Sequence, residues 1–264
     1  MTGTLRILAA TSRNMFVNRF TVVPPAYWAA QILVTSFFSM YFFSSLASYV
    51  GNPEATAQYV VIGNAVQSIA ATTLLSVTEI PSIEKHSGTL GGLMQTPAPL
   101  FTVFFGMSLF SIFTGIVAVS ASLSFAAFFF HISFAGCDFA SLLAIIAMTC
   151  LSLTGMGMLL GGVGLHLRTS AIIANVVAYI GLLICGVNFP VSYLPGWLQT
   201  VSHCLPLTYA ADAARAAVGG APLSELLQPM GMMALIGAAA AVAAWFVFRF
   251  FERLLRRGGR IDMF

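Results

Sequence analysis

Four side chains of the types that bind metals or transfer protons lie between residues 131 and 212. They are His131, Asp138, His203 and Asp212. Imidazole and carboxylate groups are common zinc ligands and general acid–base catalysts. The spacing of these four residues matches no ligand motif, so the sequence favours ordinary residues of a membrane interface. We expect no catalytic residue and no bound metal in this chain.

Binding of a nucleotide phosphate is the next possibility. A phosphate-binding loop needs a lysine, and Lys85 is the only lysine in the sequence. No GxxxxGK[ST] motif surrounds it, so the chain lacks a phosphate-binding loop of the Walker A kind. The glycine-rich run "TGMGMLLGGVGLHL" lies within an apolar stretch, where Gly157 and Gly161 form a small-xxx-small pair. This pattern favours helix packing over a nucleotide-binding loop.

Charge is concentrated in "EIPSIEKHSGTLGGLMQTPAPL", residues 79–100, between stretches that are almost uncharged. The segment from Ser82 to Met94 can form a short amphipathic helix, with Ile83, Leu90 and Met94 as its apolar contacts. The alternative is a solvated loop that merely joins two apolar segments.

The composition indicates that membrane-spanning helices position these residues. The 264 residues are 59% hydrophobic and 7% charged, far below the roughly 25% charged residues of an average soluble domain. A helix of about 20 apolar residues crosses about 30 Å of hydrocarbon. We therefore predict one all-α transmembrane domain over residues 1–264, with six spans: 26–47, 57–78, 101–129, 139–165, 171–189 and 229–250.

The basic residues predict the orientation of these spans, since they concentrate on the cytoplasmic side. With both termini cytoplasmic, only Arg215 of the eleven lysines and arginines lies outside. The other ten are Arg6, Arg13, Arg19, Lys85, Arg168, Arg249, Arg253, Arg256, Arg257 and Arg260. Residues 79–100 then form a cytoplasmic loop and residues 251–264 a basic cytoplasmic tail.

Two segments outside the spans have helical patterns. Residues 1–23 place apolar side chains on one stripe, which predicts a helix lying in the membrane interface or, alternatively, a frayed basic tail. The external segment 190–228 contains two helical pieces divided by Pro206, with Thr208 as the expected N-cap of the second. We predict a re-entrant hairpin or a surface-lying pair, in which Asp212 and Arg215 can pair. A disulfide between Cys137 and Cys204 is left open.

Polar stripes mark two of the spans. One helical face of the second span carries Asn64, Gln67, Ser68 and Thr78, and one face of the fifth carries Asn175, Tyr179 and Gly186. These residues either line a substrate path or form hydrogen bonds between helices. No span has a carboxylate or a basic residue in its central part, where a gradient-driven transporter commonly keeps one. Any uphill transport therefore takes its energy from another chain.

Together these motifs resemble the type-2 permease family of ATP-binding cassette (ABC) exporters over essentially the whole chain. The loop "EKHSGTLGGLMQTP" resembles the acidic residue, Gly-Thr-Leu and downstream proline of that family. The external "NFPVSYLPGWLQTVSHCLPLTYAADAAR" resembles its Leu-Pro-x-Trp, Pro-Leu-Thr-Tyr and Asp-x-x-Arg pattern. The chain departs from the family at Gly91 and Gly92, where a glutamate often follows Gly-Thr-Leu.

The resemblance implies a permease in a bacterial inner membrane that exports a drug-like, lipid or lipid-linked substrate. Its partners are a second copy or a similar permease, membrane lipids and two ATPase subunits that bind ATP and Mg²⁺; no nucleic acid is involved. The expected ATPase contacts are Glu79, Glu84, Lys85, Gly88, Thr89, Leu90 and Pro97. The expected external hairpin residues are Pro195, Trp197, Pro206, Tyr209, Asp212 and Arg215. A gradient-driven carrier or a membrane-embedded enzyme is the alternative.

Overall fold

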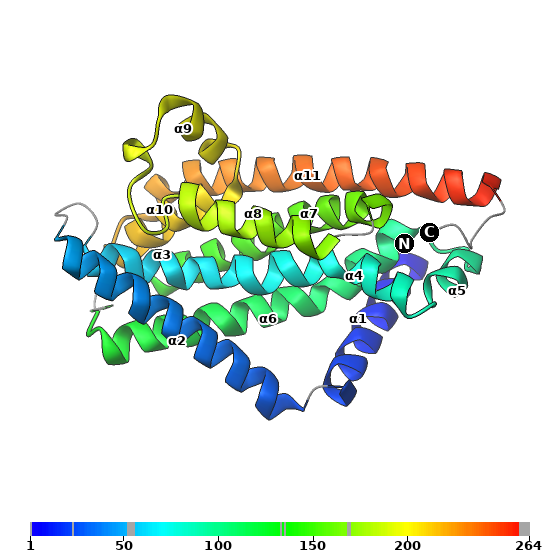
Figure 1. Ribbon diagram of the computed structural model, residues 1–264, viewed down its shortest axis with the longest axis horizontal. Helices are drawn as coiled ribbons and strands as arrows, with labels where there is room; N and C mark the ends of the chain where they lie inside the picture. Colours follow the sequence, from blue (N-terminus) through cyan, green and yellow to red (C-terminus); the bar gives the residue numbers. More distant parts are fainter. Residues whose placement is uncertain are drawn as a thin grey trace.

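The computed structural model describes residues 2–22, 24–51, 56–132, 134, 136–167 and 170–258, and over these residues the chain is helical without strands. The long helices lie side by side in an elongated bundle (Figure 1). The short helix α5 (Leu90–Gln95) lies at one end and α9 (Gly196–His203) at the other. We call these the α5 end and the α9 end.

Five helices of the described chain are long and apolar enough to cross a membrane. They are α2 (Pro25–Val50), the continuous α3–η1–α4 (Ala57–His86), α6 (Leu100–Phe129), α7 (Phe139–Leu167) and α11 (Leu223–Gly258). At 1.5 Å per residue each exceeds the thickness of the hydrocarbon core. The predicted all-α class is therefore confirmed, whereas the number of spans is five by this measure rather than six.

The expected fifth span, 171–189, corresponds to the shorter helix α8 (Ser170–Ile184). Its 15 residues rise only about 22 Å, which is too short to cross unaided. The helix ends early because Gly186 adopts a left-handed conformation with φ 70°. Residues 185–190 are then non-helical before the 3₁₀ turn η2 (Val191–Tyr193).

The second long helix changes its hydrogen-bonding pattern midway. It consists of α3 (Ala57–Ile69), the π-helical segment η1 (Ala70–Leu74) and α4 (Leu75–His86). The hydroxyl of Thr56 caps its start by accepting from the Tyr59 amide at 3.3 Å. A π segment accommodates one extra residue and is frequent at functional sites. The helix continues through Pro81 to the α5 end.

Close contacts between helices depend on glycine, as predicted for α7. A Cβ atom at Gly157 would lie 2.9 Å from Cβ of Val77, and one at Gly161 would lie 2.9 Å from the Thr78 carbonyl oxygen. Both distances are too short for a real side chain, so these glycines allow α7 to pack against α4. The interpretation of Gly157 and Gly161 as packing residues is confirmed.

At the α5 end, α1 (Thr2–Val22) packs against α6. A Cβ atom at Gly106 would lie 3.2 Å from Cα of Leu8, so the two helices approach closely there. Pro25 occupies the first turn of α2, where its missing N–H costs little. The predicted N-terminal helix is therefore present as α1, which runs steeply to the long axis of the bundle at the α5 end and meets the start of α2 at a sharp bend (Figure 1).

At the α9 end, α9 is followed by α10 (Pro206–Val218). Pro206 is the first residue of α10, so the expectation that Thr208 caps this helix is wrong. Thr208 is buried and donates from Oγ1 to the Ser202 carbonyl at 2.6 Å, which ties α10 to the end of α9. Gly219 is the C-terminal cap of α10.

Candidate functional site

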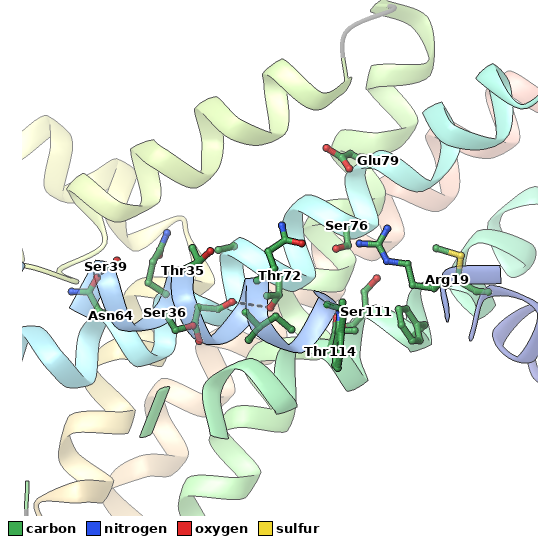
Figure 2. Close-up of a pocket in the computed structure, with 18 of the residues that line it drawn as sticks. Arg19, Thr35, Ser36, Ser39, Asn64, Thr72, Ser76, Glu79, Ser111 and Thr114 are labelled. Carbon is green, nitrogen blue, oxygen red and sulfur yellow. Dashed lines mark hydrogen bonds between the residues drawn. The ribbon is translucent and has the colours of Figure 1, made fainter. Parts of the chain in front are cut away.

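A cavity of about 230 Å³ lies between α2 and α3–η1–α4, with α6 behind it and the end of α1 beside it. In Figure 2, Thr35, Ser36 and Thr72 face this space, with Arg19 and Glu79 towards one end. We call it the polar groove, because hydroxyl and amide side chains from three helices line it. They are Gln31, Thr35, Ser36, Ser39, Asn64, Gln67, Ser68, Thr72, Ser76, Ser111 and Thr114.

One wall of the groove comes from α2, which the sequence analysis did not identify. Gln31, Thr35 and Ser39 follow one another at four-residue steps in this otherwise apolar helix. Residues four apart lie on one face of a helix, so the same periodicity test used for the second span could have found them.

The second helix supplies the opposite wall, and η1 determines which residues reach it. Asn64, Gln67 and Ser68 line the groove as their shared face predicts, but Thr78 does not. Thr78 instead donates to the Gly157 carbonyl of α7 at 3.3 Å. The extra residue in η1 rotates everything after Leu74 by about 100°. Placing Thr78 on the same face was therefore wrong.

Hydrogen bonds join the walls of the groove on the side that lies towards the α9 end. Ser39 of α2 donates to Oδ1 of Asn64 at 3.1 Å. The amide nitrogen of Asn64 donates to the Val60 carbonyl at 2.9 Å and to Oδ1 of Asn188 at 2.8 Å. Asn64 thus links α2 and α3 to the non-helical segment after α8.

Two buried polar atoms in the groove wall have no hydrogen-bond partner in the described protein: Oε1 of Gln67 and Oγ of Ser111. Gln67 uses its amide nitrogen to donate to the Ala178 carbonyl of α8 at 3.2 Å, which leaves Oε1 as a free acceptor. Unpaired buried polar groups cost about 1–3 kcal/mol each and are rare in folded proteins. Both atoms belong to residues that line the same cavity.

The second polar stripe does not reach this cavity. The side chain of Tyr179 is 64% exposed on α8, and Asn175 is only half-buried. Neither residue lines the groove, although α8 touches Gln67 from behind through Ala178. The residues expected to form one path therefore lie on two different surfaces of the chain.

At the α5 end the expected amphipathic helix over 82–94 is divided in two. The chain turns at Ser87 and Gly88, where Gly88 has φ 73°, and α5 starts at Leu90. The Thr89 amide donates to the Glu84 carbonyl at 3.1 Å, and its hydroxyl donates to the Glu84 carboxylate. We call residues 84–95 the α4–α5 elbow.

The remaining residues predicted to contact an ATPase occupy different surroundings. Lys85 donates from Nζ to the Leu165 carbonyl of α7 at 3.3 Å, while Leu90 packs against the apolar core of the α5 end. Pro97 is exposed after α5. Glu79 lies apart from the elbow, because it lines the polar groove together with Arg19 of α1.

Arg215 is the most extensively bonded side chain at the α9 end, and its side chain is only 12% exposed. Its Nη2 donates to the carbonyls of Gly186 at 2.6 Å and Val187 at 3.0 Å, and its Nε donates to the Tyr59 carbonyl at 3.2 Å. The guanidinium also lies 3.5 Å from the centre of the Tyr59 ring. Arg215 thus fixes α10 to the start of α3 and to the non-helical backbone after α8.

The predicted pair between Asp212 and Arg215 is confirmed, with Nη1 of Arg215 3.2 Å from Oδ1 of Asp212. Burial lowers the pKa of Arg215 from its ordinary value, and the carboxylate of Asp212 acts in the opposite direction. The pair is exposed on its Asp212 side, so the carbonyl contacts of Arg215 matter more for the fold.

The other residues predicted for the external hairpin also lie at the α9 end, in or next to α9 and α10. Pro195 precedes α9 and Pro206 starts α10, whereas Trp197 is 69% exposed. Tyr209 packs on the core, with its ring centre 5.9 Å from that of His203.

The candidate acid–base residues do not gather. In the part of the chain that the structure describes, no group of three or more histidine, cysteine, aspartate or glutamate side chains could hold a metal. Asp138 instead caps α7: it accepts from the Ser141 hydroxyl at 2.6 Å and from the Ala140 amide at 3.1 Å. These hydrogen bonds, chiefly that of Ser141, lower the pKa of Asp138. Cys137 and Cys204 are both free thiols.

Comparison with known proteins agrees with this arrangement. The model of the family described as "ABC-2 type transporter" matches residues 7–218. Two curated relatives, from Escherichia coli strain K12 and from Escherichia coli O157:H7, are each described as "Probable multidrug ABC transporter permease YbhR". Each is 23% identical over 200 residues, which cover 75% of this chain and 54% of the relative. The chain therefore spans about half the length of the relatives it matches.

Proposed function

Because this chain belongs to the ABC-2 type transporter family, we propose that it is the permease subunit through which an ABC transporter exports an amphiphilic substrate. The chain has several long apolar helices and belongs to a permease family, so it is a multi-pass membrane protein. In this proposal a separate subunit binds ATP and Mg²⁺ and hydrolyses the nucleotide, and the permease couples that hydrolysis to movement of the substrate.

The observation that carries the proposal is the polar groove within an otherwise apolar bundle. Its walls offer hydroxyls and amides of three helices rather than a catalytic arrangement of acids and bases. Such groups form weak, exchangeable hydrogen bonds, which suit a molecule that must both enter and leave. The substrate class is drug-like, lipid or lipid-linked, in keeping with the multidrug description of the relatives.

We place the α5 end in the cytoplasm of a bacterium and the α9 end outside its inner membrane. The basic residues of α1 and Arg249 and Arg253 of α11 belong to the α5 end, whereas Arg215 belongs to the α9 end. Arg168 and Arg260, which the sequence assigns to the cytoplasm, lie outside the described residues, as do the side chains of Arg256 and Arg257. In this orientation α1 lies in the inner interface and α9–α10 forms the external hairpin, with α8 completing six crossings.

Cysteine labelling tests this topology. In a variant without native cysteines, Ser87→Cys in the elbow should react with a membrane-impermeant maleimide only after the membrane is opened. Ser224→Cys at the start of α11 should react in intact cells. Both positions are exposed, so access to the reagent is not limited by packing. Labelling of both from the same side would contradict the orientation.

The proposed ATPase contact is the α4–α5 elbow, with Glu84, Gly88, Thr89 and Leu90. Its outward surface includes Gly92, which is exposed and where an added Cβ atom would meet nothing within 4 Å. A second copy of the chain, or a similar permease, is the proposed membrane partner. The exposed apolar side chains of α2 and α8, such as Phe38, Phe42 and Ile172, supply surface for that partner and for lipid.

Coexpression with an ABC ATPase encoded beside this chain tests the coupling. The two proteins should copurify, and ATP hydrolysis in vesicles should rise when a substrate such as a hydrophobic cationic dye is added. Gly92→Asp should reduce copurification while leaving insertion unchanged, because it places a charge in the proposed contact. The matched control Gly196→Asp lies on α9 at the opposite end of the bundle, where an added Cβ atom also meets nothing within 4 Å. Transport that continues without ATP but follows an ion gradient would contradict the proposal.

A further inference from the structure

The two unpartnered polar atoms of the groove indicate what kind of group it receives. Gln67 is 91% buried, since its exposure is 9%, and Ser111 is 1% exposed. Because the Gln67 amide nitrogen is committed to the Ala178 carbonyl, its Oε1 can only accept. The Ser111 hydroxyl can donate or accept. A ligand that satisfies both atoms must therefore carry at least one O–H or N–H donor.

The size of the groove limits how much of a ligand it can hold. Its volume of about 230 Å³ is below the roughly 300–1,000 Å³ of pockets that enclose a drug-sized molecule. The wall from Asn64 to Glu79 covers 15 residue steps, or about 22 Å along the helix axis. The space is long and narrow, so it fits a polar headgroup but not a whole amphiphile.

An aromatic cluster borders the groove where α1, α2 and α6 meet. Trp28 and Phe110 line the groove, and their rings lie 5.7 Å and 5.8 Å from that of Phe20. Phe16 packs against Phe20 at 4.9 Å and against Phe110 at 5.4 Å, and it is 45% exposed. The cluster thus runs from the groove to the outer surface of the helices, which gives a hydrocarbon tail an apolar place beside the headgroup.

The charges near the α5 end of the groove are balanced. Arg19 and Glu79 both line it, and among the described residues neither makes an ion pair. One cation and one anion match a headgroup that carries both signs better than a headgroup with a net charge.

We propose that the polar groove binds the zwitterionic, hydrogen-bond-donating headgroup of a membrane-resident amphiphile whose tail stays in the bilayer beside the aromatic cluster. This inference rests on the proposed transport function and specifies how its substrate is held. The headgroup enters past Arg19 and Glu79 and donates to Oε1 of Gln67, which lies about 18 Å farther along the helix than Glu79. It enters sideways from the leaflet at the α5 end, so the tail need not pass through the protein.

Quenching of Trp28 fluorescence tests the proposal without any ATPase. Trp197→Phe and Trp245→Phe leave Trp28 as the only tryptophan of the three. The full chain is placed in phosphatidylcholine vesicles with small amounts of phosphatidylethanolamine or phosphatidylcholine that carry the same nitroxide on one acyl chain. Both headgroups are zwitterionic, but only ethanolamine donates hydrogen bonds. The ethanolamine probe should quench at a mole fraction roughly fivefold lower, the change expected for one hydrogen bond.

Two variants and one control locate the effect. Ser111→Ala and Gln67→Leu should each reduce the preference for the ethanolamine probe, and Ser111→Ala should do so without loss of thermal stability, because its hydroxyl has no partner in the protein. Thr154→Val removes a buried hydroxyl that bonds only within its own helix, to the Cys150 carbonyl, and should leave the preference unchanged.

Three outcomes would overturn the inference: equal quenching by the two probes, a preference that survives both Ser111→Ala and Gln67→Leu, or displacement of the probe by millimolar glycerophosphoethanolamine, which would assign the site to a free soluble molecule. ATP-dependent transport could persist in each of these cases. Failure of this inference is therefore distinguishable from failure of the proposed function.

Discussion

Replacing Arg215 with methionine is expected to lower the free energy of unfolding by about 3–5 kcal/mol, the cost of leaving buried partners without their charged donor. Methionine has a similar reach but no donor. The carbonyls of Tyr59, Gly186 and Val187 would lose the N–H groups that they now accept from. The Gly186 carbonyl keeps the Tyr59 hydroxyl as a donor at 2.9 Å, but no regular helix supplies a donor to Val187, because α8 has already ended.

Thermal or detergent-induced unfolding of the purified permease measures this effect. Asp212→Asn is the matched control: it removes the other half of the ion pair, but Asp212 is 60% exposed, so a loss below about 1 kcal/mol is expected. Arg215→Lys should behave more like methionine than like arginine, since one ammonium group cannot reproduce the forked contacts. An Arg215→Met variant as stable as Asp212→Asn would show that the carbonyls find other donors.

Replacing Gly88 with valine is expected to abolish most of the coupling between ATP hydrolysis and transport. Gly88 has φ 73°, where an L residue costs about 1–2 kcal/mol and a β-branched one more. No atom lies within 4 Å of a Cβ placed there, so the penalty is conformational rather than steric. Relief of that strain opens the α4–α5 elbow, and the equilibrium constant for its closed form falls about tenfold or more.

Gly88→Asn is the control, because asparagine tolerates the left-handed conformation. Transport and substrate-stimulated ATP hydrolysis should be measured for both variants in vesicles that contain the partner ATPase, at equal amounts of inserted permease. Valine should uncouple the two activities and asparagine should largely retain them. Equal activity of the two variants would mean that the elbow does not transmit the signal.

The helical class and the long apolar segments were predictable, because composition and length determine both. The Asp212–Arg215 pair was also predictable from a three-residue spacing on one helix. The elbow was not, because the pattern of Ile83, Leu90 and Met94 fits one helix equally well. The division into α4 and α5 becomes visible only in the structure, where Gly88 has a left-handed backbone conformation. A proline at Thr89 would therefore not interrupt a helix, since Thr89 precedes α5.

The polar groove was predicted in part. Periodicity on a single helix found Asn64, Gln67 and Ser68, but it assumed 100° per residue throughout. The π segment η1 adds a residue without any mark in the sequence, which turned Thr78 away. Periodicity also cannot tell which helices become neighbours. The stripe of α8 was paired with the groove, whereas α2 supplies the opposite wall.

The length of α11 has a mechanical consequence. Its 36 residues extend about 54 Å, which exceeds the hydrocarbon core by more than 20 Å. Near one end it packs against α10, the helix that carries Arg215. Near the other end Oε1 of Glu252 accepts from the Leu100 amide at 3.3 Å, where the chain leaves the elbow region and enters α6. One continuous helix therefore joins the α9 end to the α5 end, and we expect a tilt of α11 imposed near the elbow to displace α10 as well.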